Sequence, residues 1–344
     1  MSLPQAVVDN AANAALDFHM DRGKVHEQHI QEKPLLRELR RRQKSFPGGK
    51  GNLTVDVAFE TFSTIEGFSA DDTLNFVNPT PIKQAAYPWK QTHTGIYVTT
   101  EELLKDGISV VDTNGQSTSE HSQRELTALA NILETKLADM SEGWSAGMNE
   151  MFWLDGTQDS KEVPGVPYFI SDDPTTGIVG GIDRAAQPKW RNISLAGANA
   201  INSGSVSIIR TLQKQVRQIR RFGSPRLLVL CGSDFLNAVE DDLYSKGQFT
   251  NQGFDKNVDV GMGEISVRGL GRLMYDPTLD DQGKSKYGYF IDTNAIQLRP
   301  IEGEDMKKHY PARPHNKMVI YRSVTWAGGL VARQLNTSMV AAIQ

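Results

Sequence analysis

STSEHSQRELTALANILETKLADMSEGWSAGMNEMFW, from Ser117 to Trp153, is the stretch on which the prediction of the fold depends. Ser117 and Glu120 have the spacing of a capping box, in which two side chains bond free backbone N–H groups at a helix start. Apolar residues then recur at steps of three and four, which is the spacing of one helix face: Leu126, Leu129, Leu133, Leu137, Met140, Trp144, Met148 and Met151. About 35 residues at 1.5 Å each predict a rod of roughly 50 Å, about three times the average helix length. Such a rod is either a core or coiled-coil helix or the spine of a thin assembly subunit.

Two extended segments precede this helix. Leu53, Val55, Val57 and Phe59 alternate with mostly polar residues, which predicts a strand, and residues 85–97 are a second extended segment. The stretch between them is polar and contains Pro79 and Pro81, so the two strands form a long hairpin. An isolated two-stranded hairpin is only marginally stable in water. It must therefore pair with a distant strand or lean on another subunit.

The second half of the chain predicts a compact α/β unit. Residues 205–221 have an apolar face and a basic face, and they end in basic residues before Gly223, as helix C-termini prefer. Residues 226–231 are a buried strand, and Ser233 is the N-cap of the next helix. Further strands are predicted at 264–267, 272–275, 287–298, 317–334 and 339–343, and loops at 156–181 and 190–203.

Residues 1–47 form a separate segment that ends at Pro47-Gly48-Gly49. Its basic part combines leucines with five cationic residues, namely Arg37, Arg40, Arg41, Arg42 and Lys44. One interpretation is a phosphate-binding patch, and the other is a helix whose charges meet acidic neighbours or water. No interleaved aromatic residues or groove-binding motif accompany the arginines, so the second interpretation is favoured.

Composition is that of an ordinary globular protein. The 344 residues are 39% hydrophobic and 23% charged, and the net charge of -4 gives no reason to expect binding to nucleic acid or to an anionic membrane. Cys231 is the only cysteine, which excludes an intramolecular disulfide and a cysteine metal cluster. No apolar run approaches the ~18–20 residues that span a bilayer.

Motifs for catalysis are absent from the sequence. His26 and His29 lack the H-E-x-x-H pattern of a zinc helix, and the paired glycines at 261–263 and 269–271 lack the context of a dinucleotide-binding turn. Cys231 ends a buried strand and is expected to be a small core residue. We therefore expect no enzyme activity, no metal and no cofactor.

The order of elements carries a resemblance to a known family. The chain runs through an arm, a hairpin, a long helix, an α/β unit, a charged loop and a long terminal strand. Six segments fit this order: Phe46-Pro-Gly-Gly-Lys50, Ala86-Tyr-Pro-Trp-Lys90, Lys105-Asp-Gly-Ile-Ser109, Met140-Ser-Glu-Gly-Trp144, Asn149-Glu-Met-Phe-Trp153 and Leu230-Cys-Gly-Ser-Asp-Phe235. In order and spacing they resemble the major capsid proteins of tailed bacteriophages, which have the Hong Kong-type phage capsid fold.

This resemblance covers nearly the whole chain and implies an α+β fold. Its parts are an N-terminal arm (1–47), an extended β-hairpin loop (48–98), a peripheral domain (99–189 and 317–344), an axial α/β domain (190–300) and a charged loop near three-fold contacts (301–316). The peripheral domain would hold the spine helix at 119–153 and an antiparallel sheet made of the terminal strands 317–334 and 339–343. Trp144 and Met148 would be buried within the chain.

The resemblance also implies a function. The chain would be a structural protein that assembles as pentamers and hexamers into an icosahedral shell around phage double-stranded DNA, which it would contact weakly and non-specifically. The arm begins at residue 1 without a long preceding segment, so a separate scaffolding protein is expected, together with a portal and a decoration protein. The protein would be assembled in the host cytoplasm and located in the virion capsid, with no membrane contact. Alternatives are an encapsulin-like compartment shell and a soluble α/β enzyme or binding domain with an oligomerising hairpin.

Contacts between subunits are expected on three segments of the chain. The extended loop would contribute Phe62, Ile65, Phe68, Asp71, Asp72, Phe76 and Lys83. The arm would contribute Leu36, Arg37, Arg40, Arg41 and Arg42. The charged loop would contribute Glu304, Lys307, Lys308 and Arg313.

Overall fold

A computed structural model covers residues 1–344, and the structure describes 31–49, 51–59, 65, 67–69, 82–99, 101, 123–202, 204, 206–245, 264–267, 270–309 and 319–344. The chain divides into two compact units, 1–32 and 33–344. The helices and strands below all belong to the second unit. Among the described residues, no helix combines the length and the apolar content that crossing a bilayer requires.

The long helix is α4 (Gln123–Phe152). Its predicted start at Ser117 lies outside the described residues, and it ends one residue before the predicted Trp153. Trp144 and Met148 are buried, as expected, and Met148 also receives a weak hydrogen bond from the Thr92 hydroxyl at 3.7 Å. The apolar stripe of this helix is therefore confirmed where its side chains are described.

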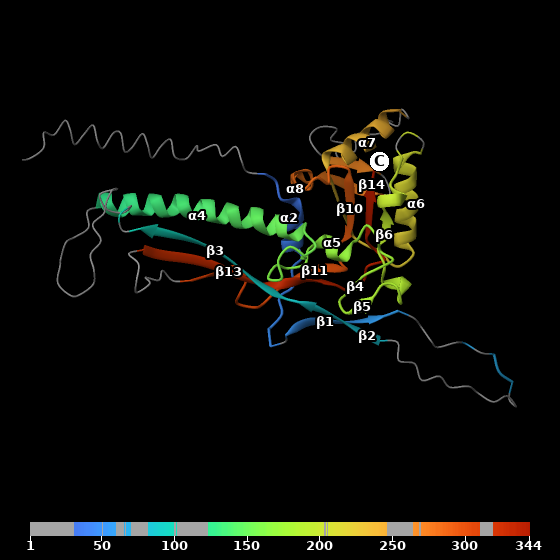
Figure 1. The fold of residues 1–344 in the computed structure, drawn as a ribbon, viewed down its shortest axis with the longest axis horizontal. Helices are drawn as coiled ribbons and strands as arrows, with labels where there is room; N and C mark the ends of the chain where they lie inside the picture. Colours follow the sequence, from blue (N-terminus) through green and yellow to red (C-terminus); the bar gives the residue numbers. More distant parts are fainter. Residues whose placement is uncertain are drawn as a thin grey trace, which may run out of the picture. The chain divides into compact units, whose positions relative to one another are not determined.

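A four-stranded sheet lies along α4 (Figure 1). Its central strand is β13 (Val319–Ala332), which pairs antiparallel with β3 (Lys90–Thr99) on one edge. On its other edge it pairs with β12 (Lys307–Lys308) and β11 (Ile296–Pro300). Trp326 of β13 is fully buried and meets the Phe152 ring edge-on at 6.4 Å. This contact joins the end of α4 to the centre of the sheet.

The predicted hairpin is present but its return segment is divided. β1 (Asn52–Ala58) pairs antiparallel with β2 (Ile82–Pro88), and the chain then passes Trp89 into β3. β2 stays in the two-stranded hairpin, whereas β3 joins β13 in the other sheet. The expectation that the hairpin segment pairs with a distant strand is thus confirmed for its second half.

A second, six-stranded sheet contains most of the predicted α/β unit. Its strands, in spatial order, are β6 (Ile193–Leu195), β14 (Met339–Ala342), β10 (Tyr287–Asp292), β7 (Leu227–Cys231), β9 (Gly271–Tyr275) and β8 (Glu264–Val267). Helices α6 (Ile208–Arg220) and α7 (Ser233–Ser245) pack on one face, where Val229 and Cys231 are buried. Leu228 and Leu230 alternate with them and enter a core on the opposite face. The sheet is therefore covered on both sides.

The last strand corrects one expectation. We predicted that 317–334 and 339–343 share the sheet of the long helix, but β14 pairs with β10 and β6 in the six-stranded sheet. The turn at Ser338 accounts for this placement, because its carbonyl accepts from the Ile193 N–H and its hydroxyl accepts from the Asp292 N–H. Every residue of β14 is buried, as expected for a strand in a sheet with both faces covered.

The segments predicted as loops contain short elements that the sequence analysis missed. They are α5 (Val166–Phe169), β4 (Ile178–Val179), β5 (Ile182–Asp183), η1 (Pro188–Trp190) and η2 (Gly197–Asn199), besides β6. Elements of two to four residues are too short to show a hydrophobic period. The short α8 (Pro277–Asp281), capped by the Asp276 side chain, follows β9.

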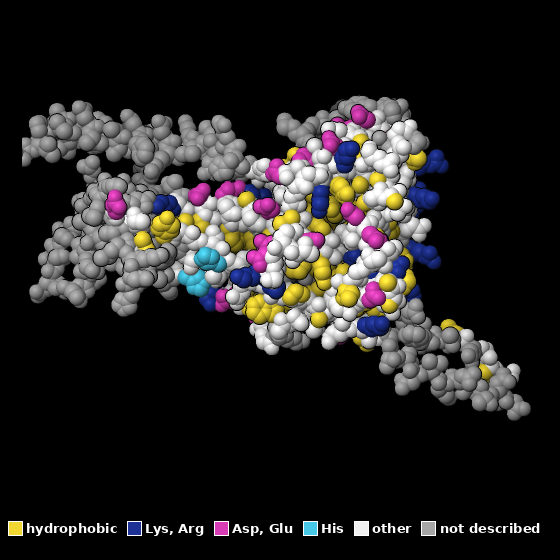
Figure 2. Space-filling model, in the orientation of Figure 1, with side chains coloured by type: hydrophobic (Ala, Val, Ile, Leu, Met, Phe, Trp, Pro, Cys, Tyr) yellow, Lys and Arg dark blue, Asp and Glu magenta, His cyan; other side chains and the backbone are white. Residues whose placement is uncertain are grey.

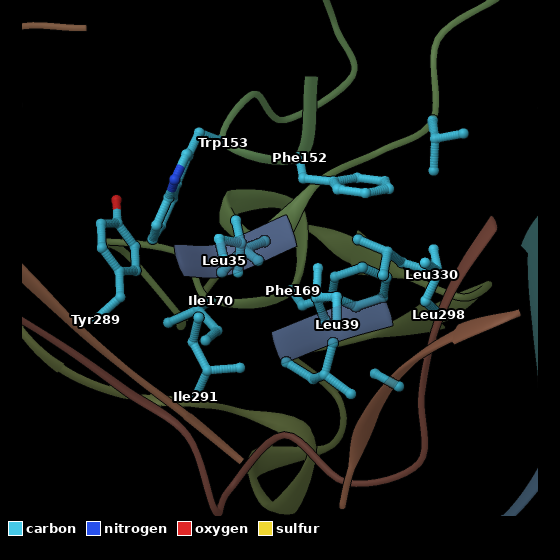
Figure 3. Close-up of a cluster of buried hydrophobic side chains, with 14 of the residues drawn as sticks. Leu35, Leu39, Phe152, Trp153, Phe169, Ile170, Tyr289, Ile291, Leu298 and Leu330 are labelled. Carbon is cyan, nitrogen blue, oxygen red and sulfur yellow. The ribbon is translucent and has the colours of Figure 1, made fainter. Parts of the chain in front are cut away.

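Helix α2 (Pro34–Arg41) joins the main core (Figure 3). Its Leu35 and Leu39 lie among side chains from α4, α5 and strands of both sheets, such as Phe152, Phe169 and Ile291. The predicted arm is thus not a separate piece in this part, because Pro34, Leu35, Leu36 and Leu39 are buried in the core of the second unit.

Candidate functional site

The base of the hairpin is anchored by its inner face. Leu53 and Tyr87 lie opposite each other on β1 and β2, and both are buried. The Tyr87 hydroxyl donates a hydrogen bond to the Ala332 carbonyl at 2.8 Å, and its ring contacts Phe169 at 5.5 Å. Burial raises the pKa of this phenol, so it stays a neutral donor. The hairpin therefore leaves the core from a fixed base.

Beyond this base, the described residues of the hairpin loop present apolar side chains to solvent. Ile65, Phe68 and Ile82 are exposed, and Lys83 is exposed on β2. An exposed apolar side chain at the end of an anchored hairpin is suited to contact another molecule. The other predicted loop residues, Phe62, Asp71, Asp72 and Phe76, lie outside the described residues.

In the arm, the structure separates the predicted contact residues into two groups. Leu36 is 5% exposed, and its N–H donates to the Asn149 side chain at 3.1 Å, so it is a core residue and not available to another subunit. Its prediction as a contact was wrong because leucines at 35, 36 and 39 all fall on the inner face of α2. Arg37 and Arg41 are exposed.

Two of the arm arginines contact residues outside α2, and a third pairs with a residue on α2 itself. The guanidinium of Arg40 lies over the Trp144 ring at 4.8 Å and 3.5 Å from an Asp305 carboxylate oxygen. Arg42 donates to the Asn294 side chain at 3.4 Å. Arg41 lies 3.6 Å from Glu38 on the same helix. The interpretation that these charges meet acidic neighbours is supported for Arg40 and Arg41.

The charged loop is joined to the arm. Asp305 accepts from Gln43 at 2.8 Å as well as from Arg40, and Phe46 forms a β-bridge with Ile301. Glu304 forms an ion pair with Lys307, whose strand β12 lies on the edge of β13. The predicted arm and loop surfaces are thus one surface, on which Lys307 and Lys308 are exposed. Arg313 lies outside the described residues.

A buried polar network, which the sequence analysis missed, connects α2 and the end of α4 to the six-stranded sheet. Asn149 of α4 accepts from the Leu36 N–H and donates to the Thr278 hydroxyl at 2.8 Å. Trp153 donates through Nε1 to the Asp276 carboxylate at 2.8 Å, and Asp276 caps α8 by accepting from the Thr278 N–H at 3.1 Å. The only signal in the sequence was polar Asn149 beside the apolar stripe of α4. The network fixes the end of α4 against the six-stranded sheet.

The described residues offer little for catalysis. Cys231 is fully buried, and desolvation raises the pKa of its thiol, which opposes formation of the nucleophilic thiolate. Within the described part of the chain, no group of three or more histidine, cysteine, aspartate or glutamate side chains is placed to hold a metal ion. His26 and His29 lie outside it. The features of the described residues that suggest a function are therefore the exposed surfaces of the hairpin, the arm and the charged loop.

Comparison with solved structures finds likeness along almost the whole chain. The cyanophage A-1(L) capsid asymmetric unit has a TM-score of 0.66 at 16% identity, covering 93% of this chain and 94% of that chain. The capsid of an empty GTA particle has a TM-score of 0.56 at 10% identity, covering 92% and 98%. The capsid of cyanophage P-SCSP1u has a TM-score of 0.56 at 9% identity, covering 94% and 91%. No family model and no curated protein matches the sequence.

These matches concern the whole architecture. Each covers more than nine-tenths of both chains, so the likeness is not confined to one sheet or one motif. At such low identity, the likeness is one of fold. The chain therefore has the Hong Kong-type capsid fold of the tailed-bacteriophage major capsid proteins.

Proposed function

We propose that this protein is the structural major capsid protein of a phage, which assembles as pentamers and hexamers into an icosahedral shell around double-stranded DNA. The observation that carries this proposal is the likeness to capsid chains over more than nine-tenths of both chains. The hairpin base anchored by Tyr87, together with exposed Ile65 and Phe68, supports it, because exposed apolar side chains on such a loop can be covered by a neighbouring subunit. This role requires no catalytic group.

Assembly rests on many weak contacts rather than on one strong contact. Three segments each contact a different neighbour: the hairpin (48–98), the exposed part of the arm (1–47) and the charged loop (301–316). Avidity multiplies the affinities of these contacts. The contact residues are the predicted ones whose side chains are exposed, namely Ile65, Phe68, Lys83, Arg37, Arg41, Lys307 and Lys308. The peripheral part (99–189 and 319–332) and the axial part (190–300 with β14) hold these segments in place.

Other partners follow from the same role. A separate scaffolding protein guides curvature, a portal occupies one vertex, and a decoration protein binds the outer surface. The net charge of -4 suits a container that holds DNA only by weak, non-specific contact. Assembly takes place in the host cytoplasm, and the mature location is the virion capsid.

The hairpin tip provides the test of this function. Deletion of residues 67–81 is expected to abolish closed particles in electron micrographs, because the loop can no longer reach the neighbouring subunit. Circular dichroism and the melting temperature of the subunit should stay close to wild type, since the buried base at β1 and β2 is intact. A control replaces 67–81 with a glycine-serine segment of equal length, which separates reach from side-chain contact.

The outcomes of this experiment separate the candidate functions. Wild-type particles from the deletion variant would contradict the assigned role of the hairpin. A wild-type chain that forms closed particles supports a shell protein. Genes for a portal and a scaffolding protein beside its own gene would then indicate a virus capsid rather than an encapsulin-like compartment. A monodisperse dimer whose melting depends on a ligand would instead indicate an enzyme or binding domain.

A further inference from the structure

Helix α6 presents an unbroken basic face to solvent. Arg210, Lys214, Arg217 and Arg221 follow one another at steps of four, three and four, so they share one side of the helix, and all four are exposed. The opposite side, from Ile208 to Ile219, is buried in the core. Figure 2 shows Lys and Arg side chains gathered along the edge where α6 lies. We call Arg210, Lys214, Arg217 and Arg221 the basic face.

The basic face is not neutralised within the described part of the chain. Helix α6 contains no acidic residue, and no carboxylate among the described residues forms an ion pair with any of these four cations. Like charges at these spacings repel one another. Arg210 also lies in the first turn, where the helix dipole disfavours a cation. Arg217 lies in the last turn, where the dipole favours a cation. The cost that an acidic partner would remove is therefore the repulsion among the four cations and the unfavourable position of Arg210.

Helix α7 carries the opposite charge on the same side of the six-stranded sheet. It contains Asp234, Glu240, Asp241 and Asp242 but no lysine or arginine. Asp242 is used within the chain, because it accepts from the Ser207 hydroxyl at 2.9 Å and the Ile209 N–H at 3.1 Å at the start of α6. Glu240 and Asp241 lie toward the C-terminal end, where the helix dipole disfavours negative charge. Asp234 and Asp241 are exposed and lie seven residues, or about two turns, apart, so they share one side of α7. Asp234 also accepts from the Ser285 hydroxyl at 2.6 Å. We call Asp234 and Asp241 the acidic face.

Apolar side chains at the ends of the basic face favour a protein partner over nucleic acid. Val206 precedes α6 and is 54% exposed, and Phe222 follows it and is 47% exposed. Protein interfaces combine arginines with aromatic and aliphatic anchors. Contact with a phosphate backbone uses cations and hydrogen-bond donors rather than apolar side chains, and the net charge of -4 makes the rest of this chain repel a polyanion. A second copy of the chain offers the required acidic face.

We propose that the basic face of α6 docks on the acidic face of α7 in the next copy of the chain. The two faces differ, so the contact is heterologous, and repetition of a heterologous contact closes a ring when the rotation permits. This inference rests on the proposed function, because a ring of copies is the unit from which a shell of pentamers and hexamers is built. Ion pairs of this kind determine register and partner choice.

A charge swap tests this contact in the full-length chain. R217E and D241R should each lower the assembled fraction at least tenfold, measured by sedimentation and electron microscopy at physiological salt. The double variant R217E/D241R should recover assembly, because every copy then carries both reversed charges, and the new carboxylate on α6 of one copy meets the new guanidinium on α7 of the next. Lys161→Glu, an exposed charge reversal outside both helices, is the matched control and should assemble like wild type.

Each outcome bears on the proposal. Normal assembly of both single variants would overturn it while leaving the proposed function intact, and failure of the double variant to recover would also overturn it. Complete shells of R217E with less packaged DNA, beside a normal D241R, would assign the basic face to nucleic acid. A wild-type chain that never assembles, even when its scaffolding protein is co-expressed, would contradict the proposed function itself. If the reversals prevent folding, Arg217→Gln should still weaken assembly, and rising salt should weaken wild-type assembly in parallel.

Discussion

Asp276 shows how a single buried residue contributes to this fold. Its carboxylate accepts hydrogen bonds from Trp153 Nε1 and the Thr278 N–H, but among the described residues it has no cationic partner. Desolvation by burial raises the pKa of this carboxyl, and the hydrogen bonds oppose the rise only in part. The residue therefore caps α8 and holds the end of α4 while its ionised form destabilises the folded state.

This balance predicts the pH dependence of Asp276→Asn. The folded state binds a proton on Asp276 more tightly than the unfolded chain does, so its ionisation lowers the free energy of unfolding as pH rises above the ordinary aspartate pKa. Asparagine does not ionise, so the variant does not lose stability in this way as the pH rises. The variant is destabilised at every pH by about 1–3 kcal/mol, because the Trp153 N–H no longer has its carboxylate acceptor. Urea unfolding at pH values from 4 to 7 measures the free energy of unfolding of both proteins. As the pH rises, the free energy of unfolding of the variant should increase relative to that of wild type. A constant difference across this range would contradict the assigned pKa shift.

At the scale of elements, the arm helix α2 differs most from its prediction. Its arginines suggested an exposed arm, yet Leu35, Leu36 and Leu39 are buried against α4 and β11. The Lys33–Glu142 ion pair and the Leu36–Asn149 hydrogen bond hold the same helix on α4. Charge dominated the local pattern, whereas the packing partners of the leucines lie more than 100 residues away in the sequence.

Leu36→Ala tests whether α2 belongs to the core. The substitution removes a buried side chain, so the free energy of unfolding should fall by about 2–5 kcal/mol. The matched control is the neighbouring exposed Arg37→Ala, which should change stability by less than about 0.5 kcal/mol. Chemical denaturation of both variants measures the difference. Equal stability of the two would show that α2 is not packed as described.

The type of an element, helix or strand, was easier to predict than the sheet to which a strand belongs. Long periodic segments such as α4, α6 and β13 were predicted because burial of one face imposes a period over many residues. The sheet to which each strand belongs was not predicted. The hydrophobic pattern of β3 carries no information on its partner, and the family resemblance led us to assign β14 to the sheet of the long helix. The break at Trp89 and the turn at Ser338 decide those partners, and both depend on contacts distant in the sequence.

The whole molecule combines two sheets, one long helix and a projecting hairpin. The order of these elements was recognisable in the sequence, so the fold could be predicted before any coordinates. The assembly surfaces were predictable only in part. Ile65, Phe68 and Lys308, which the sequence analysis predicted as contacts between subunits, are exposed, and their contacts remain a prediction. The sequence could not show that Leu36 is buried or that Arg40 and Asp305 join the arm to the charged loop.

Electron microscopy of particles purified after expression of the full-length chain, with image reconstruction, tests the central claim most directly. The proposed function predicts closed icosahedral shells in which this chain occupies both five-fold and six-fold positions. The hairpin should extend over a neighbouring subunit, and α6 of one copy should face α7 of the next. A homogeneous population of monomers or dimers, with no particles under any salt condition and with the scaffolding protein co-expressed, would contradict the account.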